Sequence, residues 1–139
     1  MPSTGIPAFP HAAQQAQQWV NELSEDLNWT DKGRAYRLFK AVLHAVRDWI
    51  SPEEAADLSA QMPLLIRGVF FEGWDPMKAP AVHRKRADFI ARVQGDFVHD
   101  PLVLPAEDVG KVLALLERHL PGGEIMQVRQ SMPKSMRAL

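Results

Sequence analysis

The fold is decided by a stretch that occurs twice in this chain of 139 residues. Residues 42–63 read VLHAVRDWISPEEAADLSAQMP, and residues 112–133 read VLALLERHLPGGEIMQVRQSMP. Both stretches begin with Val-Leu, keep apolar residues three or four positions apart, meet helix-breaking residues and end with Met-Pro. Each copy therefore predicts the same order of elements: a long helix, a break, a short helix and a turn that begins at proline.

The correspondence extends well beyond this stretch. Residues 16–69 align with residues 86–139 at an offset of 70 without a gap, and the apolar positions and both breaks stay in register. A unit of about 55 residues buries too little apolar surface to be comfortably stable alone. We therefore predict an all-α fold in which two homologous units, each of three or four helices, cover each other's apolar faces in one pseudo-twofold helical bundle.

Local signals delimit the helices within each unit. Helical periodicity begins at Gln14, and Thr30 or Asp31 can cap the second helix. Ser51 and Glu54 have the spacing of a capping box at the start of the third helix. No segment alternates apolar and polar residues as a half-buried strand would, so no sheet is expected.

The chain divides into an N-terminal arm and one domain. Three prolines and little periodicity over residues 1–13 predict a flexible arm. Residues 14–139 then form a single helical domain, built of a first repeat (14–72), a connector (73–83) and a second repeat (84–139).

Composition excludes several classes of protein. The chain has no cysteine, which excludes disulfide frameworks, thiol nucleophiles and zinc–thiolate sites. With 16 Lys and Arg against 17 Asp and Glu, it lacks the net basic character of general nucleic-acid binding. The longest apolar stretch, residues 64–71, is too short to span a bilayer, and no secretory signal is visible. We expect a cytoplasmic protein without a membrane span, metal or cofactor.

Three blocks of sequence carry a family resemblance. They are AVLHAVRD at residues 41–48, PEEAA at 52–56 and QMPLLIRGVFFEGWDP at 61–76. Together they resemble the bacterial family known as domain of unknown function 2267, with residues 64–76 as its signature. The resemblance covers nearly the whole chain after the arm. It implies a helical fold, and it implies no activity.

The signature supplies the first candidate binding site. Phe71 and Trp74 could form an apolar rim, with Arg67, Glu72 and Asp75 as polar groups that hold a ligand or partner. Alternatively, the aromatic rings fill the junction of the two units, and Arg67 pairs with Glu72 or Asp75. We favour the structural alternative, because large aromatic side chains mostly serve burial.

A second candidate is the pair His44 and Asp48, one helical turn apart, which could form a general base. No nucleophile accompanies the pair, since Ser51 is a cap and cysteine is absent. The second copy has Ala114 and Arg118 at these positions, so a surface helix pair is the better interpretation.

The remaining histidines do not predict a metal site. His99 and His119 align with Trp29 and Trp49, and positions that accept either residue type are typically half-buried.

Basic residues form the last candidate. Arg84, Lys85, Arg86 and Arg92 could contact an acidic partner, RNA or a membrane surface, but the nearby Asp88 and Asp96 favour a solvated helix start. A second basic cluster lies on the polar side of the second predicted helix, at Arg34, Arg37 and Lys40.

Three functional hypotheses follow. The first is a non-catalytic helical binding or scaffolding module that contacts a protein partner or a second copy of itself, and it requires an exposed apolar patch. The alternative is a small-ligand or lipid-binding bundle with an apolar cavity near Phe70, Phe71 and Trp74. An enzyme that uses His44 and Asp48 comes last.

Overall fold

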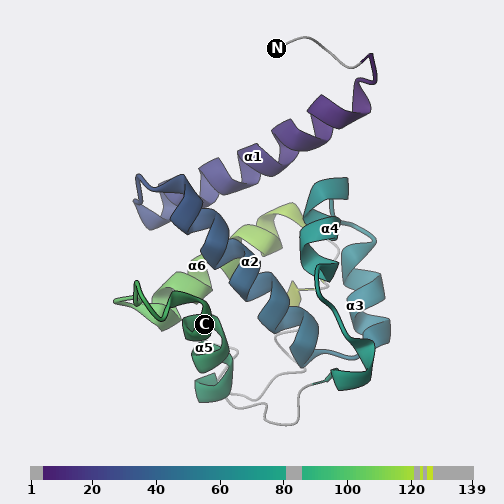
Figure 1. Ribbon diagram of the computed structural model, residues 1–139. Helices are drawn as coiled ribbons and strands as arrows, with labels where there is room; N and C mark the ends of the chain where they lie inside the picture. Colours follow the sequence, from purple (N-terminus) through teal and green to yellow (C-terminus); the bar gives the residue numbers. More distant parts are fainter. Residues whose placement is uncertain (1–4, 81–85, 121–122, 124, 127–139) are drawn as a thin grey trace.

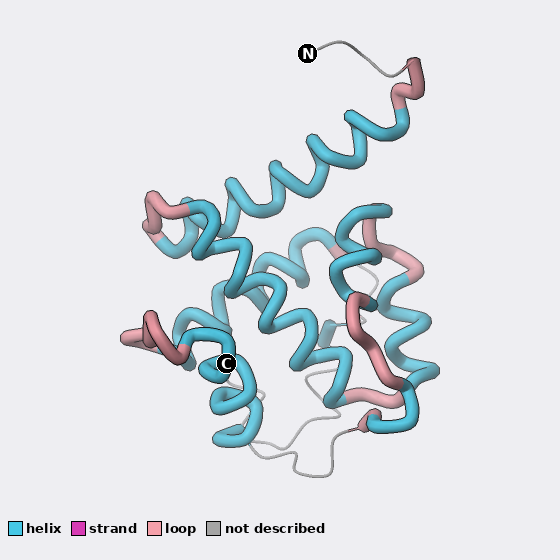
Figure 2. Tube along the Cα trace, viewed as in Figure 1, coloured by secondary structure: helices cyan, strands magenta, loops and turns pink. Residues whose placement is uncertain are grey.

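The computed structural model describes residues 5–80, 86–120, 123 and 125–126, and these residues form helices and loops without a strand (Figures 1 and 2). The elements are α1 (Ala8–Leu27), α2 (Lys32–Trp49), α3 (Pro52–Ser59), α4 (Leu64–Phe71), the 3-10 turn η1 (Pro76–Lys78), α5 (Arg86–Gln94), the 3-10 turn η2 (Gly95–Phe97) and α6 (Pro105–His119). The all-α prediction is confirmed for this part of the chain.

Helix starts that depend on local capping agree with the sequence analysis. The Asp31 side chain accepts a hydrogen bond of 3.0 Å from the backbone N–H of Arg34 at the start of α2. At the start of α3, Ser51 and Glu54 form both 3.1 Å bonds of a capping box. Each bond satisfies a backbone N–H that the first helical turn leaves unpaired.

The start of α1 differs from the prediction. This helix begins at Ala8 rather than Gln14, so residues 8–13, assigned to the N-terminal arm, are helical. Pro10 lies in the first turn, where a backbone N–H has no intrahelical partner and its absence costs nothing. The prolines therefore permit the helix that they were expected to prevent.

The second half of the chain and the connector before it contain two short 3-10 turns, and the structure describes few of the last residues. In the second repeat, α5 ends at Gln94 and the chain tightens into η2. The connector 73–83 contains the short turn η1. The short helix and the turn predicted at the end of the second copy fall largely on residues that the structure does not describe; of residues 121–139 it describes 123, 125 and 126, of which 125 and 126 are helical, and Ile125 is buried.

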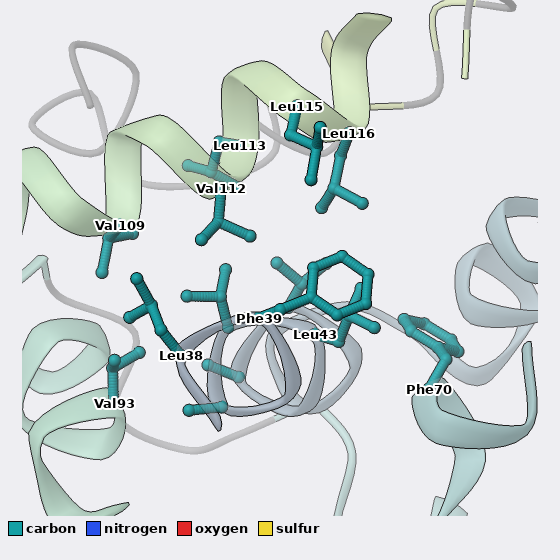
Figure 3. Packing of buried hydrophobic residues seen from close by; sticks show 14 of the residues in the cluster. Leu38, Phe39, Leu43, Phe70, Val93, Val109, Val112, Leu113, Leu115 and Leu116 are labelled. Atoms are coloured by element: carbon teal, nitrogen blue, oxygen red, sulfur yellow. The ribbon is translucent and has the colours of Figure 1, made fainter. Parts of the chain in front are cut away.

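Helix α2 lies at the centre of the molecule and contacts α1, α4, α5 and α6 (Figure 1). Its apolar side chains face α6, with α4 and α5 on either side. Figure 3 shows this packing for Leu38, Phe39 and Leu43 of α2, Val109, Val112, Leu113 and Leu116 of α6, Val93 of α5 and Phe70 of α4. Burying each such side chain contributes about 1.5–3 kcal/mol, so contacts between the two halves of the chain account for much of the stability.

Contacts between the halves recur at the offset of 70 residues. Trp19 stacks on His119 at 4.3 Å between ring centroids, and Phe89 meets Trp49 edge-on at 5.3 Å. Residue 89 corresponds to residue 19, and residue 119 corresponds to residue 49. The two aromatic contacts thus join corresponding positions: Trp19 contacts His119, and their counterparts Phe89 and Trp49 contact each other.

Ion pairs follow the same rule with their charges exchanged. Arg118 of α6 pairs with Glu22 of α1 at 2.9 Å, and Arg92 of α5 pairs with Asp48 of α2. Position 92 corresponds to 22, and position 118 to 48. The acidic Glu22 therefore corresponds to the basic Arg92, and the acidic Asp48 corresponds to the basic Arg118.

Candidate functional site

Arg67 holds the C-terminal end of α3. Its Nε donates to the carbonyl oxygen of Ser59 at 3.0 Å, and its Nη2 donates to the carbonyl oxygens of Met62 at 3.1 Å and Ala60 at 3.4 Å. These are carbonyls that a helix end leaves without intrahelical donors. The predicted pairing of Arg67 with Glu72 or Asp75 is therefore wrong.

The aromatic rings of the signature pack on one another. Phe70 is fully buried in the core and meets Phe71 at 5.0 Å between ring centroids, and Phe71 meets the half-buried Trp74 at 4.9 Å. Phe71 and Trp74 pack against the core, so the rings attach the segment after α4 to it. The indole N–H of Trp74 is buried and has no hydrogen-bond partner among the described residues.

Glu72 and Asp75 have separate partners. The exposed Glu72 carboxylate pairs with Lys40 at 3.0 Å, and the Lys40 hydrogen bond lowers the pKa of Glu72. Asp75 accepts a 3.0 Å bond from the backbone N–H of Met77 and so caps η1. The five signature residues therefore do not converge on one point in space.

Arg47, which the sequence analysis missed, is the charged side chain that organises this region. It is 4% exposed, and its Nη1 donates to the carbonyl oxygens of Phe70 at 3.1 Å and Glu72 at 2.6 Å. Its Nε donates to Asp48 at 3.0 Å. A charged residue inside the apolar stripe of α2 was the available signal, since buried charges require partners.

His44 and Asp48 do not form a pair. His44 Nε2 lies 2.7 Å from the carbonyl oxygen of Val69, and burial lowers the pKa of the imidazole, which favours the neutral ring as donor to this carbonyl. Asp48 instead accepts hydrogen bonds from Arg47 and Arg92. Both candidates for a general base therefore hold other elements against α2.

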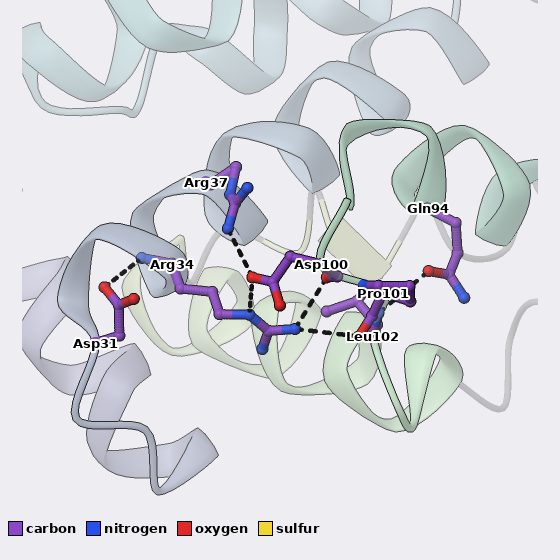
Figure 4. A network of polar contacts seen from close by, with 7 residues as sticks. All are labelled: Asp31, Arg34, Arg37, Gln94, Asp100, Pro101 and Leu102. Carbon is purple, nitrogen blue, oxygen red and sulfur yellow. Dashed lines mark hydrogen bonds and ion pairs between the residues drawn. The ribbon is translucent and has the colours of Figure 1, made fainter. Parts of the chain in front are cut away.

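The cluster on α2 holds the loop before α6 (Figure 4). Arg34 Nε pairs with Asp100 at 2.7 Å, and Arg37 pairs with the same carboxylate oxygen at 3.0 Å. Arg34 also donates to the carbonyl oxygen of Pro101 at 3.3 Å, and its guanidinium lies 4.3 Å above the centre of Trp29. The Arg34 hydrogen bond lowers the pKa of Asp100.

Of the other basic candidates, the structure describes the side chain of Arg92. Arg92 pairs with Asp48. Arg84, Lys85 and the side chain of Arg86 lie outside the described residues.

Among the residues that the structure describes, no group of three or more His, Asp and Glu could hold a metal ion. His119 is half-buried, as expected, and Glu22 contacts its Nε2 at 2.6 Å, whereas His99 is exposed. None of the helices described is both long and apolar enough to cross a membrane.

An apolar groove between α1, α2 and α4, the first groove, is the best candidate for a binding site. It has a volume of about 350 Å³, and its lining is mostly apolar, with Ala13, Ala16, Val20, Leu65 and Val69, together with Tyr36 and the charged Lys32 at its edge. The side chains of Leu65 and Tyr36 are 44% and 39% exposed. Beside the groove, the first turns of α1 extend beyond the other helices, and Phe9 is 58% exposed (Figure 1). The available sequence signal was a run without Asp, Glu, Lys or Arg from residue 5 to 21.

Comparison with known proteins places the chain in a family. A family model described as "Uncharacterized conserved protein (DUF2267)" matches residues 16–139. The chain belongs to the DUF2267 family. A search of the curated proteins finds no match to this DUF2267 chain. The matched region begins eight residues after the start of α1, so the extended first turns of the helix precede it.

Proposed function

We propose that this DUF2267 protein is a non-catalytic interaction module that binds a second copy of itself through the first turns of α1 and the first groove. One observation carries the proposal. Phe9, Ala13, Ala16 and Val20 lie at spacings of three and four residues, so a single apolar stripe runs from the exposed end of α1 into the groove. A stripe that continues from an exposed helix end into a groove is typical of an interface that another chain covers.

A second copy is the partner that the charges favour. Residues 5–21 contain no Asp, Glu, Lys or Arg. Among the described residues that line the first groove, Lys32 is the charged one, and its Nζ donates to the side chain of Asn21 at 2.7 Å. In a twofold contact each surface meets its own copy, and like charges on it would repel. The uncharged stripe avoids this repulsion, and the small side chains of Ala13 and Ala16 allow two helices to approach closely.

A non-catalytic role is supported by the contacts of the side chains that could otherwise act in catalysis. His44, Arg47 and Asp48 all direct polar atoms to α4, to the segment after it or to α5. Their contacts are those of residues that hold a scaffold.

We further propose that the scaffold consists of two related units packed about an approximate twofold axis. A twofold axis would place α5 where α1 lies and α6 where α2 lies. It would therefore turn the contact of α1 with α6 into a contact of α5 with α2, and the structure has both contacts. The same axis relates the ring pair of Trp19 and His119 to that of Phe89 and Trp49.

Light scattering on a sizing column tests the self-association. We expect the wild-type chain to have the mass of a dimer, and both Phe9→Asp and Leu65→Asp to have the mass of a monomer, because each places a charge in the apolar contact. Phe9 lies in the first turn of α1, where an aspartate favours the helix, so the fold should persist in this variant.

The matched control is Val103→Asp, since Val103 is 89% exposed but lies outside the first groove. This variant should remain a dimer. A wild-type monomer over the whole accessible concentration range, or a Phe9→Asp dimer, would contradict the proposal.

A further inference from the structure

Three cationic side chains from three parts of the chain line one pocket beside the C-terminal half of α2. The pocket has a volume of about 290 Å³, and the described residues that line it are Arg47, Asp48, Gly73, Asp75, Lys78 and Arg92. Arg47 belongs to α2, Lys78 to η1 and Arg92 to α5. None of these residues lines the first groove, so this charged pocket is a separate place on the molecule.

Arg47 reaches the charged pocket with one nitrogen unused. The residue is 4% exposed, its Nε donates to Asp48, and its Nη1 donates to the carbonyl oxygens of Phe70 and Glu72. Its Nη2 donates no hydrogen bond to any residue that the structure describes. A buried guanidinium is costly unless its N–H groups find acceptors, and an acceptor bound in the pocket would supply the missing one.

The charges that line the pocket leave a positive excess. Arg47 binds one oxygen of the Asp48 carboxylate and Arg92 binds the other, so a single negative charge faces two guanidinium groups. Lys78 Nζ lies 4.0 Å from Asp75 Oδ2. Three cations against two carboxylates leave one positive charge without a counterpart among the described residues that line the pocket, and this favours an anionic ligand.

Asp75 restricts which anion the pocket accepts. Its Oδ1 accepts a hydrogen bond from the backbone N–H of Met77, and its Oδ2 has only the long contact with Lys78. This carboxylate repels an anion without a proton, whereas it accepts a hydrogen bond from an anion that carries one. At about pH 6 a phosphate group retains a proton and offers further oxygens as acceptors, and sulfate and carboxylate groups do not retain one.

We infer that the charged pocket binds a protonated phosphate group, either the free ion or the phosphate of a small monoester. Arg47 Nη2, Arg92 and Lys78 donate to its oxygens, and Asp75 accepts a hydrogen bond from its hydroxyl. The inference goes beyond the proposed function, because the pocket shares no residue with the surface proposed for self-association.

Isothermal titration calorimetry of the full-length chain with inorganic phosphate tests the inference. The titration is carried out at about pH 6 and constant ionic strength, with sulfate as the matched anion that lacks a proton. We expect phosphate to bind at least about tenfold more tightly than sulfate, because only phosphate can donate a hydrogen bond to the Asp75 carboxylate. Equal affinities, or no phosphate binding up to millimolar concentrations, would overturn the inference.

The first variant removes a cation from the pocket. Lys78→Gln should weaken phosphate binding about two- to fivefold, as expected for one exposed charge. The Lys78 side chain is 85% exposed, so the fold should persist. The matched control is Lys111→Gln, which removes the same charge from an exposed position of α6 outside the pocket and should leave the affinity unchanged. Equal effects of the two substitutions would contradict the assignment.

The second variant tests the selection of a proton. Asp75→Asn keeps an oxygen that can accept from the Met77 N–H, but it replaces the free carboxylate oxygen by an amide that donates. Sulfate should therefore bind more tightly to this variant, and the preference for phosphate should fall to about twofold or less. An unchanged preference would show that Asp75 does not contact the anion.

A parallel titration with ethyl phosphate distinguishes the two sources of the group. Tighter binding of inorganic phosphate would assign the pocket to the free ion, and tighter binding of the ester would assign it to a phosphorylated small molecule. Either result supports a phosphate site. Repeating the titration with Phe9→Asp separates this inference from the proposed function, since loss of self-association should leave the phosphate affinity unchanged.

Discussion

At the scale of single residues, the polar side chains of α2 bind backbone atoms more than they bind one another. His44 contacts the carbonyl oxygen of Val69, Arg47 contacts those of Phe70 and Glu72, and Arg34 contacts those of Asp100 and Pro101. Backbone carbonyls occur at every residue, so the sequence does not reveal which of them will be the acceptor. This is why the candidate pair His44 and Asp48 looked plausible from its spacing alone.

The pH dependence of stability should report on His44. Burial lowers its pKa in the folded chain below the ordinary value of 6.5, so the unfolded chain binds a proton more readily. The stabilisation from neutral His44 is therefore complete above pH 6.5 and is lost as the pH falls from 6.5 towards the folded-state pKa. Urea denaturation at a series of pH values measures this slope.

The matched variant is His44→Gln, whose side-chain amide can still donate to the Val69 carbonyl but does not titrate in this range. Its stability should depend less on pH below 6.5 than that of the wild-type chain. Identical slopes for the two proteins would show that His44 does not titrate differently on unfolding.

At the scale of elements, Arg47 is the main polar link between α2 and α4. We expect Arg47→Met to lower the free energy of unfolding by about 3 kcal/mol, because a buried guanidinium with several acceptors is removed and their carbonyls remain. Arg37→Met, which removes an exposed ion pair, should cost less than about 1 kcal/mol. Urea denaturation compares the variants, and equal losses would assign no special role to Arg47.

Element boundaries were predictable where a local side chain decides them. Asp31 and the Ser51–Glu54 box act within three residues, so their bonds could be inferred before any tertiary contact was known. The start of α1 differs from the prediction because three prolines and little periodicity over residues 1–13 indicate an arm, although the first turn of a helix accepts proline.

The candidate site was less predictable than the helices. Arg67 binds the carbonyls at the end of α3, and Asp48 binds Arg92, which is 44 residues away in sequence. Both choices depend on which elements come together, and residue spacing alone does not contain that information.

At the scale of the whole molecule, the two halves share one core. Val42, Leu43 and Val46 of α2 are fully buried, and α5 and α6 supply part of their cover. We expect a fragment of residues 1–80 to lack cooperative thermal unfolding by circular dichroism, because its central helix would expose this face to water. Adding a fragment of residues 86–139 should restore the transition. A cooperative transition in the first fragment alone would mean that the first half is an independent domain.

The exchanged charges of the two ion pairs affect how copies of this chain can assemble. Suppose that the first half of one molecule took the place of the second half in another. Glu22 would then face Asp48 at the new junction, and the two displaced halves would bring Arg92 against Arg118. Both encounters repel, whereas the normal arrangement attracts at both places. Under the twofold relation that we propose, this reversal of charge therefore favours contact between the two different halves over contact between two copies of the same half.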